Sequence, residues 1–172
     1  MSKIKESIAH ELHKPARKNF PRRRVKVLQP GDLLQADLVD MQKFSKDNKG
    51  YKYLLTVIDC FSKKGWAVPV KDKSGPLVTK AMESILPNNV KNLQTDQGLE
   101  FFNKTFAALM KQKNINHYHT YSHMKASICE RYNRTIKSWM WREFSVQGNY
   151  KWLDLLPKLF TSIIIKCTGP LE

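Results

Sequence analysis

The sequence has few cysteines, few acids and no long apolar run, and each shortage excludes a class of protein. Its three cysteines form no CxxC pair, which argues against a zinc ribbon or a disulfide framework and favours a reducing compartment. Its longest apolar cluster, residues 159–165, is interrupted by Thr161 and Ser162 and falls far short of the roughly 18 residues of a membrane span. The opening segment MSKIKESIAHEL is too polar for a secretory signal peptide. We therefore expect a soluble, intracellular chain with no membrane partner.

Positive charge, in contrast, is abundant and uneven. The chain has 30 lysines and arginines against 15 acids, a formal net charge of +15. Nine of the basic residues and two of the acids lie within the first 30 residues, where HKPARKNFPRRRVK shows no hydrophobic period. We interpret residues 1–29 as a basic extended arm, in which Arg22, Arg23 and Arg24 would bind a nucleic-acid backbone. The clusters KPARK and PRRRVK also resemble nuclear-import signals, so we expect a nuclear protein. The alternative is a solvated tail that only aids solubility.

The 172 residues suit one compact domain. From residue 30 the hydrophobic pattern predicts strands and helices in a mixed α/β order. Strands are expected at 33–39, 51–61, 66–70, 90–95 and 115–121. Helices are expected at 74–86, after the cap Asn103, at about 127–145 and at 151–164. We place the folded core at 30–150.

Three acids lie where a metal-dependent reaction would need them. Asp37 lies inside an apolar strand, a costly place for a charge unless it is paired or binds a cation. Asp96 ends a strand at a glycine turn, and Glu130 lies in the first turn of the long helix. Taken singly, these are an ordinary strand-end acid, a turn residue and an i, i+4 partner of Arg134. Only their conjunction indicates a site, and carboxylates without nitrogen or sulfur ligands suit Mg²⁺ or Mn²⁺.

The long helix has two predicted faces. Its apolar face should contact the core and consists of Ile128, Tyr132, Ile136, Trp139 and Met140. Its opposite, exposed face should present Glu130, Asn133, Arg134 and Lys137. One acid followed by an amide and two cations suits a metal ion and a phosphate backbone together. Cys129 is interpreted as a small buried residue rather than a nucleophile, and His117 as a polar strand residue.

These residues resemble the catalytic core of retroviral-type integrases. The resemblance covers residues 14–157 and rests on LLQADLVDMQ, YKYLLTVIDCFSKKGWAVPVKDKSG, LQTDQGLEF and KASICERYNRTIKSWMW, in that order. The basic KPARKNFPRRR lead-in is similar to that of integrases of Polinton (Maverick) DNA transposons. The resemblance implies an α/β, ribonuclease H-like fold with a five-stranded mixed sheet flanked by helices.

The same resemblance implies roles for individual residues. Asp37, Asp96 and Glu130 would be the catalytic triad and would hold two divalent ions, Mg²⁺ or Mn²⁺. By position in the motif, the amide and the two cations of the helix (Asn133, Arg134 and Lys137) would contact DNA. The partners would be element ends and target DNA, bound by a homo-oligomer.

The resemblance predicts a metal-dependent DNA integrase, a polynucleotidyl transferase that processes 3′ ends and transfers strands of a transposable element. We find no HHCC zinc motif before the core, and LFTSIIIKCTGPLE is unlike the family's continuation, so residues 151–172 are expected to form a helix and a divergent, truncated tail. Two alternatives remain. One is an inactive or domesticated DNA-binding protein that keeps the fold, and the other is a ribonuclease of the same fold.

Overall fold

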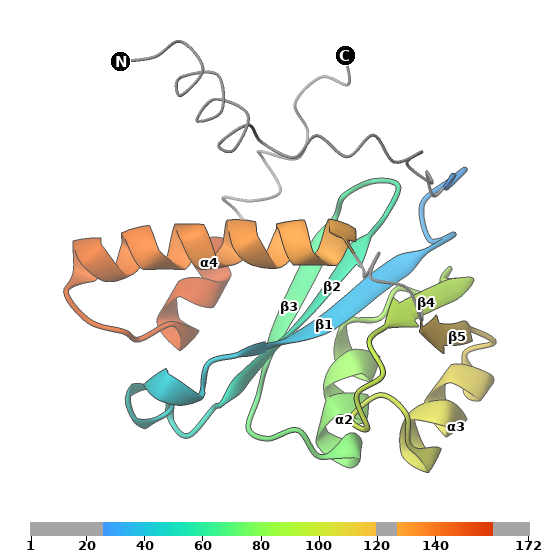
Figure 1. The fold of residues 1–172 in the computed structure, drawn as a ribbon, viewed down its shortest axis with the longest axis horizontal. Helices are drawn as coiled ribbons and strands as arrows, with labels where there is room; N and C mark the ends of the chain where they lie inside the picture. Colours follow the sequence, from blue (N-terminus) through green and yellow to red (C-terminus); the bar gives the residue numbers. More distant parts are fainter. Residues whose placement is uncertain (1–25, 120–126, 160–172) are drawn as a thin grey trace, which may run out of the picture.

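The computed structural model describes residues 26–119 and 127–159. Five strands form one sheet in the order β3-β2-β1-β4-β5 (Figure 1). The strands are β1 (Leu34–Asp40), β2 (Tyr53–Asp59), β3 (Gly65–Val70), β4 (Asn92–Thr95) and β5 (Asn116–His119). β2 pairs antiparallel with β1 and β3, whereas β4 pairs parallel with β1 and β5. The predicted five-stranded mixed sheet of a ribonuclease H-like α/β fold is therefore confirmed.

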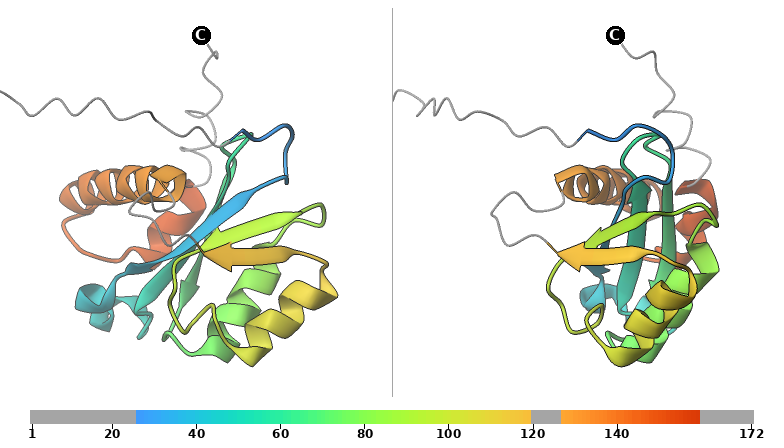
Figure 2. Two further views of the ribbon diagram at one scale, coloured as in Figure 1. Left: turned by 45° about the vertical axis from the view of Figure 1, so that its right-hand side comes forward. Right: turned by 90° about the vertical axis from the view of Figure 1, so that its right-hand side faces the viewer.

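Helices cover both faces of this sheet. Two of them, α2 (Gly75–Ile85) and α3 (Lys104–Gln112), pack on one face, and the long α4 (Ser127–Gln147) crosses the other (Figures 1 and 2). Three short 3₁₀ turns complete the described elements: η1 (Gln42–Phe44), η2 (Lys46–Asn48) and η3 (Leu153–Leu155). Figure 2 shows that the carboxyl ends of β4 and β5 lie on the side where α4 begins. At this end of the sheet, side chains from β4, β5 and α4 can meet.

Two apolar cores result from the alternation of the central strands. Leu54 and Ile58 of β2 pack against α4, while Leu55 and Val57 pack against α2 and α3. All seven residues of β2 are buried because helices cover both of its faces. The strand was predicted as buried from its β-branched and aromatic residues, and this is confirmed.

Local signals set several helix ends. The Asn103 side chain accepts a hydrogen bond from Phe106 N at 2.9 Å, which confirms the predicted cap of α3. Ser74 precedes α2 as expected, although its side chain makes no capping hydrogen bond. The helix expected at 151–164 begins instead with the η3 turn. Most of the predicted arm, with its three arginines, lies outside the described residues, as does the tail beyond residue 159.

Close packing of one glycine holds α4 against the sheet. Gly65 begins β3 beneath Tyr132 of α4, whose side chain is 6% exposed. A Cβ atom at Gly65 would lie 2.3 Å from Cζ of the Tyr132 ring. Only a residue without a side chain lets the ring approach the strand this closely.

We expect Gly65→Ala to lower the free energy of unfolding by about 1–3 kcal/mol, because the ring and the helix that carries it must shift. Urea denaturation measures this cost. In a Tyr132→Ala background the same substitution should cost much less, since the clashing ring is gone. An equal cost in both backgrounds would show that the contact does not constrain α4.

Candidate active site

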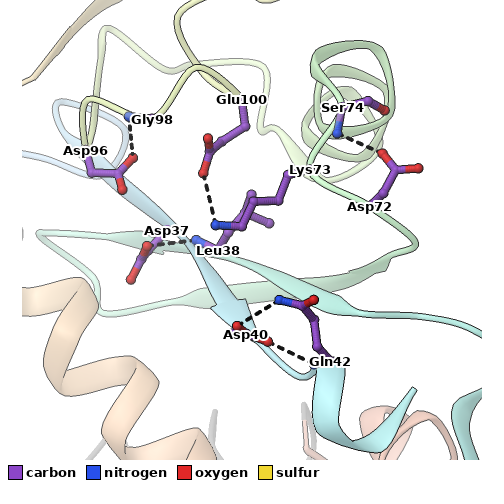
Figure 3. A network of polar contacts seen from close by, with 10 residues as sticks. All are labelled: Asp37, Leu38, Asp40, Gln42, Asp72, Lys73, Ser74, Asp96, Gly98 and Glu100. Atoms are coloured by element: carbon purple, nitrogen blue, oxygen red, sulfur yellow. Dashed lines mark hydrogen bonds and ion pairs between the residues drawn. The ribbon is translucent and has the colours of Figure 1, made fainter. Parts of the chain in front are cut away.

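Parallel pairing of β1 with β4 brings two acids to the same level. The register joins Leu34 to Leu93 and Gln35 to Gln94. Asp37 and Asp96 each follow their glutamine by two residues, so strand alternation puts both acids on the glutamines' side of the sheet. β4 ends one residue before Asp96, and Figure 3 shows Asp37 on β1 below the turn that carries Asp96. The sheet thus opens between the two acids.

The turn after β4 holds Asp96 at the protein surface. Gly98 N donates a hydrogen bond to Oδ1 of Asp96 at 3.2 Å, and Phe101 N donates to the Gly98 carbonyl oxygen at 3.0 Å. Lys73 lies 3.9 Å from the Glu100 carboxylate in the same turn (Figure 3). The Asp96 side chain is exposed, which leaves it accessible to a ligand from solvent.

Asp37 is half-buried and makes hydrogen bonds through both carboxylate oxygens. Leu38 N donates to Oδ1 at 2.8 Å, and Nδ2 of Asn133 donates to Oδ2 at 2.8 Å. The Asn133 Oδ1 atom in turn accepts from the Thr56 hydroxyl at 2.7 Å. A chain of hydrogen bonds from β2 through α4 therefore orients the acid on β1.

The expected placement of Asn133 on the exposed face of α4 is wrong. This side chain is 7% exposed and contacts Asp37 and Thr56. Seven residues at 100° each set Asn133 only about 20° from Met140, so it lies at the margin of the buried face. Glu130, Arg134 and Lys137 are exposed, as predicted.

Burial and neighbouring charge both act on Asp37. Burial is the largest cause of a raised pKa for this carboxyl, and the Asp96 and Glu130 carboxylates raise the pKa further. The Lys137 ammonium opposes them and lowers the pKa. The three predicted acids thus lie within electrostatic range of one another, with one cation of α4 beside them.

The acids surround one region without forming a closed ligand set. Within residues 26–119 and 127–159, no group of three or more His, Cys, Asp or Glu side chains is placed to hold a metal ion. The donors nevertheless fit a hard divalent cation, because all three are carboxylates and their mutual repulsion already raises the pKa of Asp37. Asp37, Asp96 and Glu130 would hold such a cation, with Asp37 kept in position by its hydrogen bond from Asn133.

Sequence reasoning missed the polar side chains beneath these acids. Gln35 and Gln94 are each 4% exposed, and Thr56 is fully buried. The available signal was polarity at alternate positions of a strand, 35 and 37, together with a threonine in the middle of β2, between Leu55 and Val57. Such positions indicate a polar layer between a sheet and the helix that covers it.

Two other reactive side chains are inert here. Cys129 is fully buried, as predicted, and burial raises its pKa to about 12, so the side chain is a thiol at physiological pH. Burial lowers the pKa of His117 to about 4, so the ring is neutral at physiological pH. That ring is 3.0 Å from the Thr95 hydroxyl and stacks on Phe102 at 4.6 Å between centroids. His117 is therefore a polar strand residue, as expected.

A shallow hollow of about 670 Å³ lies elsewhere, where the loops before β4 and β5 meet. Its lining includes Lys111 and Lys113 at the end of α3. Cations at this position stabilise the C-terminus of a helix. The hollow is at the amino ends of the strands, opposite the acids, and its positive charge is explained by this stabilisation of the α3 C-terminus.

None of the helices in the described parts of the chain is long and apolar enough to cross a membrane.

We expect two substitutions to shift the pKa of Asp37 in opposite directions. Asp96→Asn removes a charge that raises this pKa and should lower it, whereas Lys137→Gln removes a charge that lowers it and should raise it. Carboxyl ¹³C shifts of the metal-free protein, followed against pH, measure both. Shifts of the same sign would contradict the proximity of these groups.

The pH dependence of the free energy of unfolding should change in the same two directions as the pKa of Asp37. Because the folded-state pKa of Asp37 is above its usual value of 3.8, the folded protein binds the proton more tightly, and stability falls as pH rises from 3.8 to the raised value. The window of falling stability should narrow in Asp96→Asn and widen in Lys137→Gln. Thermal unfolding across this pH range gives the measurement.

Comparisons with known proteins give the family of this chain. The family described as "Integrase core domain" matches residues 28–123. A transposon-derived protein of Caenorhabditis elegans is 28% identical over 72% of this chain and 44% of its own length. The Pol polyprotein of radiation murine leukemia virus is 32% identical over 78% of this chain and 23% of its own length. The chain thus spans less than half of these curated relatives.

Solved structures share the fold at lower identity. An intasome of simian T-cell lymphotropic virus in complex with a PP2A regulatory subunit, B56 gamma, matches with a TM-score of 0.72 and 19% identity, over 91% of this chain and 58% of that chain. The HTLV-2 integrase catalytic core domain in complex with magnesium (trimeric form) matches with a TM-score of 0.62 and 20% identity, over 78% and 86%.

Proposed function

Because the chain belongs to the integrase core domain family, we propose that it is the catalytic core of a DNA integrase that mobilises a transposable element. The reaction is polynucleotidyl transfer. Water first hydrolyses a phosphodiester near a 3′ end of the element, which frees a 3′-hydroxyl and releases a short 5′-phosphorylated fragment. The freed 3′-hydroxyl then attacks a phosphodiester of target DNA, which forms a new phosphodiester and expels the 3′-hydroxyl of the target strand. The observation that supports the proposal is the β1–β4 register, after which Asp37 and Asp96 each follow two residues later, with Asp96 and Glu130 in electrostatic range of Asp37.

Asp37, Asp96 and Glu130 would hold two Mg²⁺ or Mn²⁺ ions. When bound, such ions activate the attacking oxygen and stabilise the leaving one. The chain's own contribution is orientation: Asn133 and Leu38 N hold the Asp37 carboxylate, and the turn after β4 holds Asp96.

The cations beside the acids fit a phosphate backbone. Arg134 and Lys137 are exposed on α4, one and two turns beyond Glu130. Lys137 is close enough to lower the pKa of Asp37, so a DNA phosphate that it bound would lie next to the reacting centre. Asn133, in contrast, supports DNA binding only indirectly, by orienting Asp37.

The setting of the reaction is part of the same proposal. The likeness to a transposon-derived protein supports a transposable element, and the KPARKNFPRRR lead-in favours one of the Polinton type. The basic clusters of the arm favour action in the nucleus. The HTLV-2 integrase core is described in dimeric and trimeric forms, which supports a homo-oligomer as the active state here.

One observation favours a second function, DNA binding without turnover. Both carboxylate oxygens of Asp37 accept hydrogen bonds from protein groups, and the described residues contain no closed metal-ligand set. A domesticated protein that kept the fold and its positive charge would look the same.

Incubation with Mn²⁺ or Mg²⁺ and a labelled duplex ending in the element's terminal repeat separates these functions. We expect trimmed and joined products, reduced at least about 100-fold in Asp96→Asn and Glu130→Gln, because each loses a metal-binding carboxylate. Glu143→Gln makes the same change further along α4 and should keep full activity.

Each other result points to a different function. Salt-sensitive DNA binding with no product in any variant identifies the inactive binder. Cleavage of RNA in an RNA–DNA hybrid identifies a ribonuclease. Products that persist in both acid variants would refute the assigned triad.

The arm should neutralise DNA phosphates. Replacing Arg22, Arg23 and Arg24 with glutamine is expected to reduce the slope of log K against log salt by about 0.9 for each phosphate that the arm no longer neutralises. The triple variant Lys80→Gln, Lys111→Gln, Lys113→Gln has the same charge change away from the acids and should alter the slope little. If both triple variants reduced the slope of log K against log salt by the same amount, the arm would act through the net charge of the protein alone.

A further inference from the structure

A buried pair of amides lies directly beneath the candidate metal ligands. Nε2 of Gln35 on β1 donates to Oε1 of Gln94 on β4 at 3.0 Å, and both side chains are 4% exposed. The two glutamines occupy the last register pair before the strands separate, two residues before Asp37 and Asp96. Their hydrogen bond therefore ties together the two strands that carry the acids at the point where backbone pairing ends.

The same pair also binds the helix that carries the third acid. Oε1 of Gln35 accepts a hydrogen bond from Cys129 N at 3.0 Å. Amide groups in the first turn of a helix have no acceptor within the helix, so the glutamine satisfies one of them from the sheet. Glu130 is the next residue, so this contact constrains the turn of α4 that carries the third acid.

A second link fixes the helix one turn later. Asn133 hydrogen bonds to both Asp37 and Thr56. Contacts at 129 and 133 lie on nearly the same side of α4, so together they set its height and its rotation over β1. The link through Asn133 aligns one acid, whereas the link through Gln35 connects all three acid-bearing segments.

We propose that Gln35 and Gln94 are positioning residues that set the distance of Glu130 from Asp37 and Asp96, and thereby the affinity of the site for divalent cations. The inference rests on the proposed metal-binding role of these acids. Both amides lie below the surface that a substrate would reach. Burying two amides costs more free energy than burying two leucines unless the amides form hydrogen bonds. The hydrogen bonds formed here also fix a direction between the segments, which apolar packing does not.

The amide geometry explains why glutamine suits position 35. Its NH₂ group reaches β4 while its carbonyl oxygen reaches α4. Leucine has a similar size and forms neither bond. Gln94 accepts its hydrogen bond from Gln35, and it is Gln35 that contacts the helix, so replacement of Gln94 should disturb Glu130 less.

The test uses Gln35→Leu, Gln94→Leu and the double variant, with Gln42→Leu as control for an exposed glutamine. Mn²⁺ binding is followed by the electron paramagnetic resonance of the free ion. Hydrogen exchange of residues 127–133 is followed in metal-free protein. We expect Gln35→Leu to weaken Mn²⁺ binding by about 10-fold or more and to speed exchange in the first turn of α4. Gln94→Leu should have a smaller effect, and Gln42→Leu none.

The double variant separates positioning from simple stability. With both amides replaced by leucine, neither amide of the pair is left buried without the other, so part of the free energy of unfolding that Gln35→Leu loses should return. The bond to Cys129 N is still missing, so weak Mn²⁺ binding and fast exchange should persist. Recovery of Mn²⁺ affinity together with stability would overturn the proposal.

Other outcomes are equally decisive. Unchanged exchange and unchanged Mn²⁺ affinity in Gln35→Leu overturn the inference, as does a wild-type protein that binds no Mn²⁺. Wild-type protein that binds Mn²⁺, shows the expected ranking of variants and joins no DNA supports the positioning role while refuting the integrase function.

Discussion

Parallel pairing between β1 and β4 is the constraint on which the candidate site depends. The register buries Gln35 against Gln94, and on each chain an acid follows two residues later, Asp37 within β1 and Asp96 just beyond β4. Backbone pairing stops there because β4 ends at Thr95 and its chain turns through a glycine. Carboxylates that would repel within a continuous ladder thus stand on either side of an opening, where a cation can approach. The opening follows from where one short strand ends.

The helix α4 completes the arrangement through polar contacts that sit within an apolar interface. Gly65 allows Tyr132 to lie close to β3, and the apolar residues of the helix bury its underside. Cys129 N and Asn133 then fix its rotation. Apolar packing supplies the free energy, whereas the hydrogen bonds select one orientation. Glu130 and Lys137 consequently face the same region as Asp37 with opposite effects on its pKa.

Much of the fold could be predicted from periodicity and caps, because those signals act over a few residues. The five strands, the cap Asn103 and the burial of Cys129 are such cases. The burial of Asn133 could not be predicted in this way, because a helical wheel does not define the edge of the buried face to better than about one residue. The roles of Gln35 and Gln94 were missed for a related reason. Their hydrogen-bond partners lie on other elements, and the local sequence does not indicate which residues those partners are.

The amino-acid sequence alone determined which segments become strands and helices, which residues could hold a cation and which integrase-like motifs they form. Tertiary structure decided which of those groups meet. It brought Asp37 to the level of Asp96, turned Asn133 inward and placed an amide pair beneath the acids. The physical reason is that strand register and helix rotation are set by contacts between residues far apart along the chain. Such contacts leave no pattern in the sequence around either residue.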